Sequence, residues 1–221
     1  IDNDVLTASS TATFGDLIVE AFQRFSENEA FVLGDRRMSY SEAADSISQI
    51  QQVLAERGIG HRSAVGALSI NMPEVWLTQA AAYLLGARYT GLHPMGSIED
   101  HLWICNDAEI EVLVVHPLFA KVGLAVLERS ETVKHLLVLG DAEGTTSIFD
   151  EMARFEAKPL EAGPAGEEDV AWLQYTGGTT GAPKGVMVSQ RAMVEECRAV
   201  LTSWQLPEVP RYLVAAPITH A

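Results

Sequence analysis

The sequence VAWLQYTGGTTGAPKGVMV, residues 170–188, joins two apolar, β-prone runs through a loop rich in glycine and threonine. Nine residues of this loop, Thr176 to Lys184, include three glycines, three threonines and one lysine. Glycine lets the backbone adopt positive φ and approach a ligand closely, so successive N–H groups can point into one concavity. Together with the hydroxyls and the lysine, these groups favour a polyphosphate ligand. A glycine-rich hairpin turn with a solvated lysine is the alternative interpretation.

The residues around Lys184 do not follow the common nucleotide-binding motifs. A Walker A loop needs Gly immediately before the Lys, Ser or Thr immediately after it, and a helix that begins there. Here Pro183 precedes the lysine, Gly185 follows it, and residues 186–188 are strand-like. The GxGxxG pattern of dinucleotide-binding folds does not occur in the sequence either. We therefore expect a phosphate loop between two strands.

Upstream of this loop, strand patterns and helix patterns alternate. Apolar, strand-like runs at 63–70, 87–92, 111–115 and 135–139 are separated by helical patterns that begin near Pro73, Ser97 and residue 118. Asn71 is expected to cap the first of these helices, and a last strand is expected over 212–216. The alternation predicts βαβ units, and hence an α/β fold with a mostly parallel sheet flanked by helices.

The two ends of the chain carry further helix signals. Apolar residues from Phe14 to Phe25 recur at helical spacing after Thr13, a good N-cap. A hairpin is expected around Gly34-Asp35, followed by a helix with Ser39 and Glu42 as its capping box. Ser189 is expected to cap a helix whose apolar stripe, from Met193 to Trp204, packs in the core.

Residues 156–168, EAKPLEAGPAGEE, interrupt this regular pattern with prolines, glycines and four glutamates. This composition is typical of a surface connection and not of a core element. We therefore divide the chain into an N-terminal α/β subdomain, residues 1–155, a linker at 156–168, and the start of a second subdomain, residues 169–221, that carries the phosphate loop.

Composition and charge exclude several classes of function. The 221 residues are 48% hydrophobic and 20% charged, as in a globular protein, and carry a net charge of −15, which disfavours a nucleic-acid partner. Cys105 and Cys197 lie far apart in the sequence, so neither a disulfide framework nor a zinc site is supported. Apolar runs are too short to span a bilayer. These features favour a reducing, cytoplasmic location.

Residues 175–185, YTGGTTGAPKG, resemble the phosphate-loop signature of the adenylate-forming enzymes, which include acyl-CoA synthetases, firefly luciferase and the adenylation domains of nonribosomal peptide synthetases. Residues 34–42, GDRRMSYSE, resemble the family's early hairpin and helix entry, and residues 216–220, APITH, resemble its next motif downstream. Within the family, residues 173–178, LQYTGG, resemble the fatty-acyl-CoA ligases in particular. The resemblance implies the N-terminal part of the large domain of such an enzyme.

The resemblance also implies a two-step reaction with ATP, Mg²⁺ and coenzyme A. A carboxylate attacks the α-phosphorus of ATP to give an acyl-adenylate and pyrophosphate, and the thiol of coenzyme A then displaces AMP. Lys184 would neutralise charge on the departing pyrophosphate, and His220 would lie beside the acyl carboxylate. Thr219 stands where the family usually has a bulky or aromatic residue. By position, the β- and γ-phosphates would be held by Thr176, Gly177, Gly178, Thr179, Thr180 and Gly181, with Thr176 nearest Mg²⁺.

Several alternatives stay open from the sequence. Family members are more than twice this long, so we expect this stretch alone to bind phosphates weakly and not to turn over. The parent could instead be an adenylation domain that activates an amino or aryl acid for a carrier protein, a truncated non-catalytic module, or a kinase with an unusual phosphate loop. A homodimer is also left open. The histidines other than His220 are expected to be structural or solvated.

Overall fold

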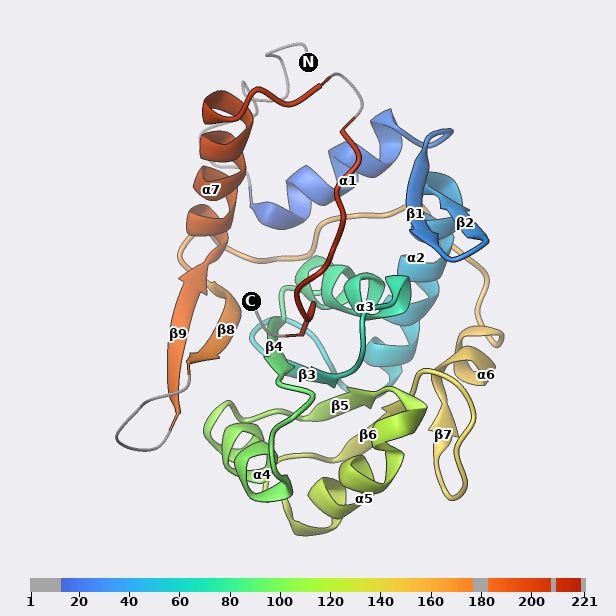
Figure 1. The fold of residues 1–221 in the computed structure, drawn as a ribbon, viewed down its shortest axis with the longest axis vertical. Coiled ribbons are helices and arrows are strands. Elements are labelled where there is room, and N and C mark those ends of the chain that lie inside the picture. Colours follow the sequence, from blue (N-terminus) through green and yellow to red (C-terminus); the bar gives the residue numbers. More distant parts are fainter. Residues whose placement is uncertain (1–12, 177–182, 208–209, 220–221) are drawn as a thin grey trace.

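A seven-stranded sheet in the order β7-β6-β5-β3-β4-β8-β9 organises the computed structural model, which describes residues 13–176, 183–207 and 210–219 (Figure 1). Strands β1 and β2 form a separate antiparallel hairpin. In chain order the elements are α1 (Phe14–Arg24), β1 (Glu29–Leu33), β2 (Arg36–Ser39), α2 (Tyr40–Glu56), β3 (Ala64–Leu68), α3 (Pro73–Leu84), β4 (Arg88–Leu92), α4 (Ile98–Asp107), β5 (Val112–Val115), a 3₁₀ turn η2 (Pro117–Phe119), α5 (Ala120–Arg129), β6 (His135–Val138), β7 (Thr146–Ser147), α6 (Ile148–Met152), β8 (Val170–Thr176), β9 (Lys184–Ser189) and α7 (Gln190–Ser203).

The starts of helices α1, α2 and α4 follow from local sequence. In each, a Ser or Thr side chain accepts a hydrogen bond from the backbone N–H three residues on, and the acid at that position accepts one from the N-cap backbone. Such a capping box satisfies two backbone donors that the helix itself leaves unpaired. The three pairs are Thr13–Asp16, Ser39–Glu42 and Ser97–Asp100.

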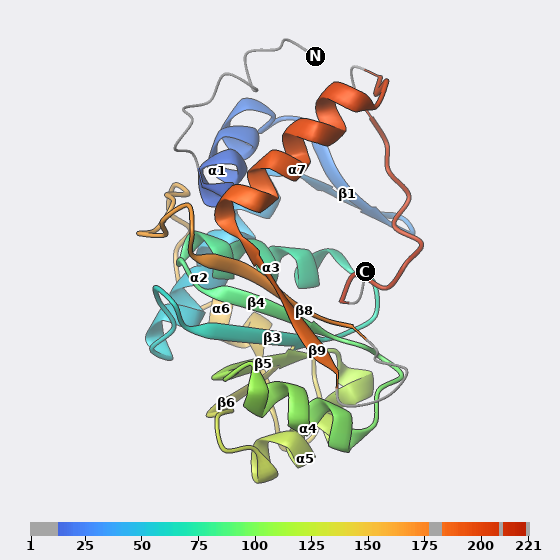
Figure 2. The same ribbon diagram turned by 90° about the vertical axis from the view of Figure 1, so that its left-hand side faces the viewer.

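The centre of the sheet is parallel and buried. Strand β3 pairs in parallel with both β4 and β5, and every residue of β3 and β5 is buried. Helices α1, α2, α3 and α6 contribute to the core on one face, whereas α4 and α5 cover the other (Figure 2). Strand β8 continues the parallel order beside β4, and β9 returns antiparallel to it. The predicted mostly parallel α/β fold is confirmed.

Three details differ from the sequence prediction. The short elements β7 and α6 were not expected. No strand forms over 212–216, because these residues lie exposed and no described strand pairs with them. The stripe of α7 is only partly core: Val194 is buried and Met193 packs against the main core, but Trp204 at the end of the helix is 55% exposed.

The 156–168 segment has no helix or strand, as expected, but it is fastened to the main body. The Lys158 backbone N–H donates to the Ser48 hydroxyl of α2 at 2.8 Å, and the Gln52 amide of α2 donates to the Glu156 carbonyl at 2.8 Å. Leu160 of this segment is nevertheless buried in the main core. The division into subdomains stays a prediction.

Candidate functional site

The antiparallel hairpin β8–β9 places the two ends of the glycine- and threonine-rich loop opposite each other. Thr176, the last residue of β8, pairs with Lys184, the first residue of β9. The Thr176 hydroxyl lies 3.5 Å from the Lys184 carbonyl oxygen, to which it donates. Both residues are exposed. The predicted strand–loop–strand arrangement is therefore confirmed, and Lys184 begins a strand and not a Walker A helix.

The middle of the predicted phosphate loop lies outside the described residues. The predicted site residues outside the described part of the chain are Gly177, Gly178, Thr179, Thr180 and Gly181 of this loop, and His220 near the end of the sequence. Their roles stay predictions that the structure does not test. The structure fixes the two ends of the loop, Thr176 and Lys184, and the residue before His220.

Tyr175 anchors the end of β8 to helix α4. Its hydroxyl donates to a carboxylate oxygen of Asp107 at 2.5 Å, and its ring makes an edge-to-face contact with Trp103 at 5.8 Å between centroids. Burial, and then the bond to Asp107, raise the Tyr175 pKa. The ring also needs a small neighbour, because a Cβ on Gly185 would lie 3.2 Å from the Tyr175 Cζ atom. Asp107 carries no local signal of this contact in the sequence, since it lies 68 residues from Tyr175.

The loop leaves the sheet at the edge where ligands bind in proteins of this architecture. Strands β3, β4 and β8 run parallel, so their carboxyl ends meet at one edge. The connection after β3 leads to α3 on one face, and the connection after β5 leads to α5 on the other. Binding sites in open α/β sheets lie beside such a reversal, outside the carboxyl ends of the strands.

The segment before His220 ends at this same edge. Thr219 is buried, and its hydroxyl donates to the Ser69 carbonyl just after β3 at 3.3 Å. Asn71 was predicted to cap α3, and this was wrong: the N-cap is Met72, with no side-chain bond. The Asn71 amide instead bonds to residues 214, 216 and 218. The sequence near Asn71 carries no signal of this role, because these partners lie 143 to 147 residues further along the chain.

Three of the histidines outside the predicted site have structural surroundings. His61 Nε2 lies 2.7 Å from a carboxylate oxygen of Asp169. The His116 ring accepts from the Leu118 backbone N–H and caps the 3₁₀ turn η2. His101 is buried, and burial lowers its pKa. These observations agree with the expectation of structural histidines.

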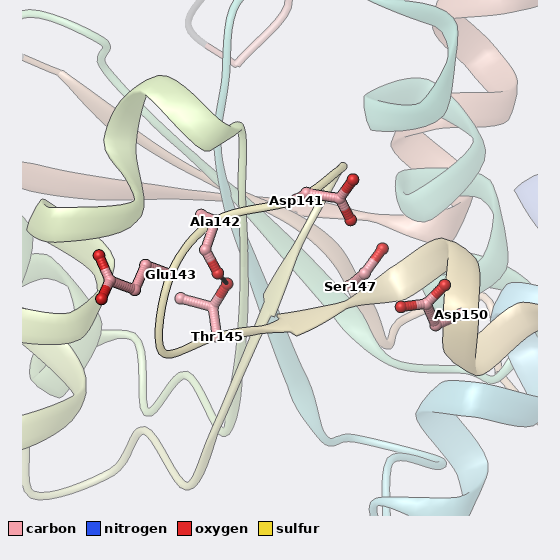
Figure 3. Close-up of a pocket in the computed structure, with 6 residues that line it drawn as sticks. All are labelled: Asp141, Ala142, Glu143, Thr145, Ser147 and Asp150. Carbon is pink, nitrogen blue, oxygen red and sulfur yellow. Dashed lines mark hydrogen bonds between the residues drawn. The ribbon is translucent and has the colours of Figure 1, made fainter.

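A separate hollow after β6 does not suit a phosphate. Figure 3 shows it between the loop that leads to β7 and the start of α6, with the carboxylates of Asp141, Glu143 and Asp150 around it. These acids would repel an anion. Within residues 13–176, 183–207 and 210–219, no group of three or more His, Cys, Asp or Glu side chains is arranged to hold a metal ion. None of the described helices combines the length and apolarity needed to cross a bilayer.

Together, the fold and the hairpin define an α/β protein with a glycine-rich loop at the carboxyl edge of a mostly parallel sheet. Residues 18–221 match the family described as AMP-binding enzyme, and the chain belongs to this family. The resemblance to adenylate-forming enzymes inferred from residues 175–185 is thereby confirmed.

Individual relatives add detail. Over 214 residues the chain is 36% identical to the medium/long-chain-fatty-acid-CoA ligase FadD8 of Mycobacterium tuberculosis, a match that covers 94% of this chain and 38% of the relative. Over 189 residues it is 30% identical to indoleacetate-CoA ligase of Aromatoleum aromaticum, covering 84% of this chain and 36% of the relative. The apo structure of MbtA from Mycobacterium smegmatis superposes with a TM-score of 0.85 at 22% identity, covering 99% of this chain and 42% of that one, which shows a shared fold.

Proposed function

We propose that the full-length protein carrying this chain is an ATP-dependent acyl-CoA ligase. It activates a carboxylic acid, preferably a fatty acid, as an acyl-adenylate with release of pyrophosphate, and transfers the acyl group to coenzyme A. The observation that carries this proposal is the β8–β9 hairpin, which sets Thr176 and Lys184 opposite each other at the carboxyl edge of the sheet. Membership of the AMP-binding family supports it.

The groups at the ends of the loop fit a phosphate chain. The exposed Lys184 ammonium donates charge-assisted hydrogen bonds that phosphate oxygens accept. The exposed Thr176 hydroxyl gives its hydrogen to the Lys184 carbonyl, and its oxygen lone pairs can face a cation that accompanies the phosphates. We assign Lys184 to the pyrophosphate that departs, where a fixed positive charge stabilises the developing negative charge. The backbone N–H groups of residues 177–181 would surround the β- and γ-phosphates.

Thr176 is the candidate for contact with Mg²⁺. A single hydroxyl is not a complete site, because Mg²⁺ takes six oxygen ligands and keeps several from water and substrate phosphates. Thr176 would therefore supply one oxygen, with the remainder from phosphate and water. A bound Mg²⁺ supplies charge neutralisation of the phosphates, and the protein supplies their position.

We place the acid next to His220. Support comes from the preceding residue, Thr219, which is buried at the ends of β3 and β4, on the sheet edge from which the loop leaves. The choice of a fatty acid rests on the 36% identity to the mycobacterial fatty-acid-CoA ligase, higher than the 30% identity to the indoleacetate ligase. A cytoplasmic location agrees with the free thiols of Cys105 and Cys197.

A substrate panel tests this function. Pyrophosphate release by the full-length protein is measured with hexanoate, dodecanoate, a cinnamate and an amino acid, with and without coenzyme A. Each buried CH₂ contributes about 0.8 kcal/mol, so kcat/KM should rise roughly fourfold per CH₂ until the acyl tunnel is filled. Activity confined to the amino acid or the cinnamate would contradict the fatty-acid assignment. Activity with none of the acids would contradict adenylation itself.

A further inference from the structure

We propose that Asn71 is a positioning residue for the acid-binding part of the site, because its side chain holds the segment that leads to His220. The inference rests on the proposed function and extends it to a residue outside the phosphate loop. It starts from residues 210–217, which form no helix or strand and lie exposed along the surface. Figure 1 shows this segment passing over α3 before it ends beside β3 and β4.

The Asn71 amide fastens this segment at three points. Its Nδ2 donates to the Val214 carbonyl at 3.1 Å and to the Ala216 carbonyl at 2.8 Å, and its Oδ1 accepts from the Ile218 N–H at 2.8 Å. Two acceptors and one donor in the segment match the two N–H groups and one carbonyl of the side chain, which fixes the orientation of the amide. The Asn71 side chain therefore supplies the hydrogen bonds that a neighbouring strand would otherwise supply to residues 214–218.

Close packing completes the attachment one residue further on. Thr219 is 3% exposed and donates to the Ser69 carbonyl, so the segment ends against the turn that also carries Asn71. Gly91 in β4 leaves room for it, because a Cβ at that position would overlap the Thr219 carbonyl oxygen. Thr219, the last described residue of the segment, is thus tied to the ends of β3 and β4.

The residues assigned to the acid and those assigned to ATP lie on different segments. Thr176 and Lys184 belong to the β8–β9 hairpin, and none of the three Asn71 bonds involves it. Loosening the 214–219 segment should therefore weaken binding of the acid more than binding of ATP. A purely structural role would instead reduce the fraction of folded enzyme and leave both KM values unchanged.

The test uses Asn71→Ala in the full-length enzyme, with initial rates of pyrophosphate release. We expect the KM for the acid to rise roughly tenfold or more on loss of three hydrogen bonds, with the KM for ATP changed by less than about twofold. Asn71→Asp keeps the acceptor for Ile218 but sets a carboxylate against two carbonyls, and should be at least as impaired. Asn106→Ala is the matched control, since Asn106 also bonds a loop, at Ser130 and Glu131, and these bonds do not involve residues 214–219. KM values for acid and ATP that stay unchanged or rise together would overturn the proposal.

A second variant guards against a folding defect at Asn71. Gly91→Ala should displace Thr219 and raise the KM for the acid selectively. Gly66→Ala serves as its control, because a Cβ at Gly66 would lie 2.6 Å from the Ile110 side chain in the core. The three nearest atoms to that Cβ include none from residues 214–219. Equal effects of the two glycine variants on the acid KM would count against the proposal.

Hydrogen exchange gives a readout that does not depend on activity. Asn71→Ala should speed exchange of the Ile218 amide at least tenfold, since that N–H loses its acceptor. Unchanged exchange would overturn the role of Asn71 even in an active enzyme. If the wild-type enzyme releases no pyrophosphate with any acid, the proposed function and the acid-site role fail together, and exchange still decides whether Asn71 holds the segment.

Discussion

Replacing Tyr175 by Phe should destabilise the sheet beside the phosphate loop while leaving its shape intact. The change removes one hydroxyl, which donates to the Asp107 carboxylate at 2.5 Å from a side chain that is 5% exposed. A hydrogen bond to a charged group is worth about 1.5 to 3 kcal/mol net. Asp107 is exposed, so water can replace the lost donor and the cost falls at the lower end. We expect the free energy of unfolding to drop by about 1.5 kcal/mol.

Urea-induced unfolding of the full-length protein measures this change. Tyr212→Phe, at a tyrosine that is 80% exposed, is the matched control and should be neutral. A double-mutant cycle with Asp107→Asn should give a coupling energy of about 1 kcal/mol. A Tyr175→Phe variant as stable as the wild type, or zero coupling to Asp107, would refute the reasoning.

The same bond sets a pH dependence with a definite sign. The folded protein holds the Tyr175 pKa above its ordinary value of 10, through burial and the bond to Asp107. The stabilising contribution is present below that ordinary pKa and declines as pH rises above it, because only the unfolded chain then loses the proton. Tyr175→Phe should show a shallower loss of stability above pH 10 than the wild type.

Three further predictions concern other parts of the chain. Hydrogen bonds from the Gly166 backbone N–H, and then from His61 and Arg62, lower the Asp169 pKa from 3.8 to about 2, so the free energy of unfolding should fall as pH drops from about 4 to 2. Asp169→Asn should show a shallower loss of stability in acid titrations and cost about 1 kcal/mol at neutral pH. Lys184→Ala should slow pyrophosphate release about 10²-fold, whereas Lys121→Ala on α5 should not, and equal rates would remove the assigned role. Leu160→Ala should lower the free energy of unfolding in urea by about 2 to 3 kcal/mol, whereas Leu118→Ala, 72% exposed in the wild type, should be neutral.

Local signals predicted well where the contacts are local. The capping box of α2, the Thr13 N-cap of α1 and the start of α4 at Ser97 are confirmed, because all of the partners lie within three residues. The parallel sheet was predicted from the alternation of strand and helix patterns, because a strand that is apolar throughout, such as β5, is typically buried on both faces of a parallel sheet. The hairpin of Thr176 and Lys184 followed from two β-prone runs joined by a glycine-rich loop.

Errors occurred where distant segments decide the structure. Asn71 has the residue type of a helix cap, but residues 214–218 take its side chain, and nothing near Asn71 in the sequence signals that contact. The apolar run at 212–216 has strand propensity, yet propensity forms no strand without a partner. Leu160 stands in a proline- and glutamate-rich segment and is nevertheless buried, because α2 binds that segment at both Ser48 and Gln52.

Product analysis of one reaction tests the central claim most directly. The full-length protein is incubated with dodecanoate, ATP, Mg²⁺ and coenzyme A, and the products are identified and counted by mass spectrometry. An acyl-CoA ligase yields AMP and dodecanoyl-CoA in equal amounts, and the account predicts this result. Formation of ADP, or of AMP without any thioester when coenzyme A is in excess, would contradict it.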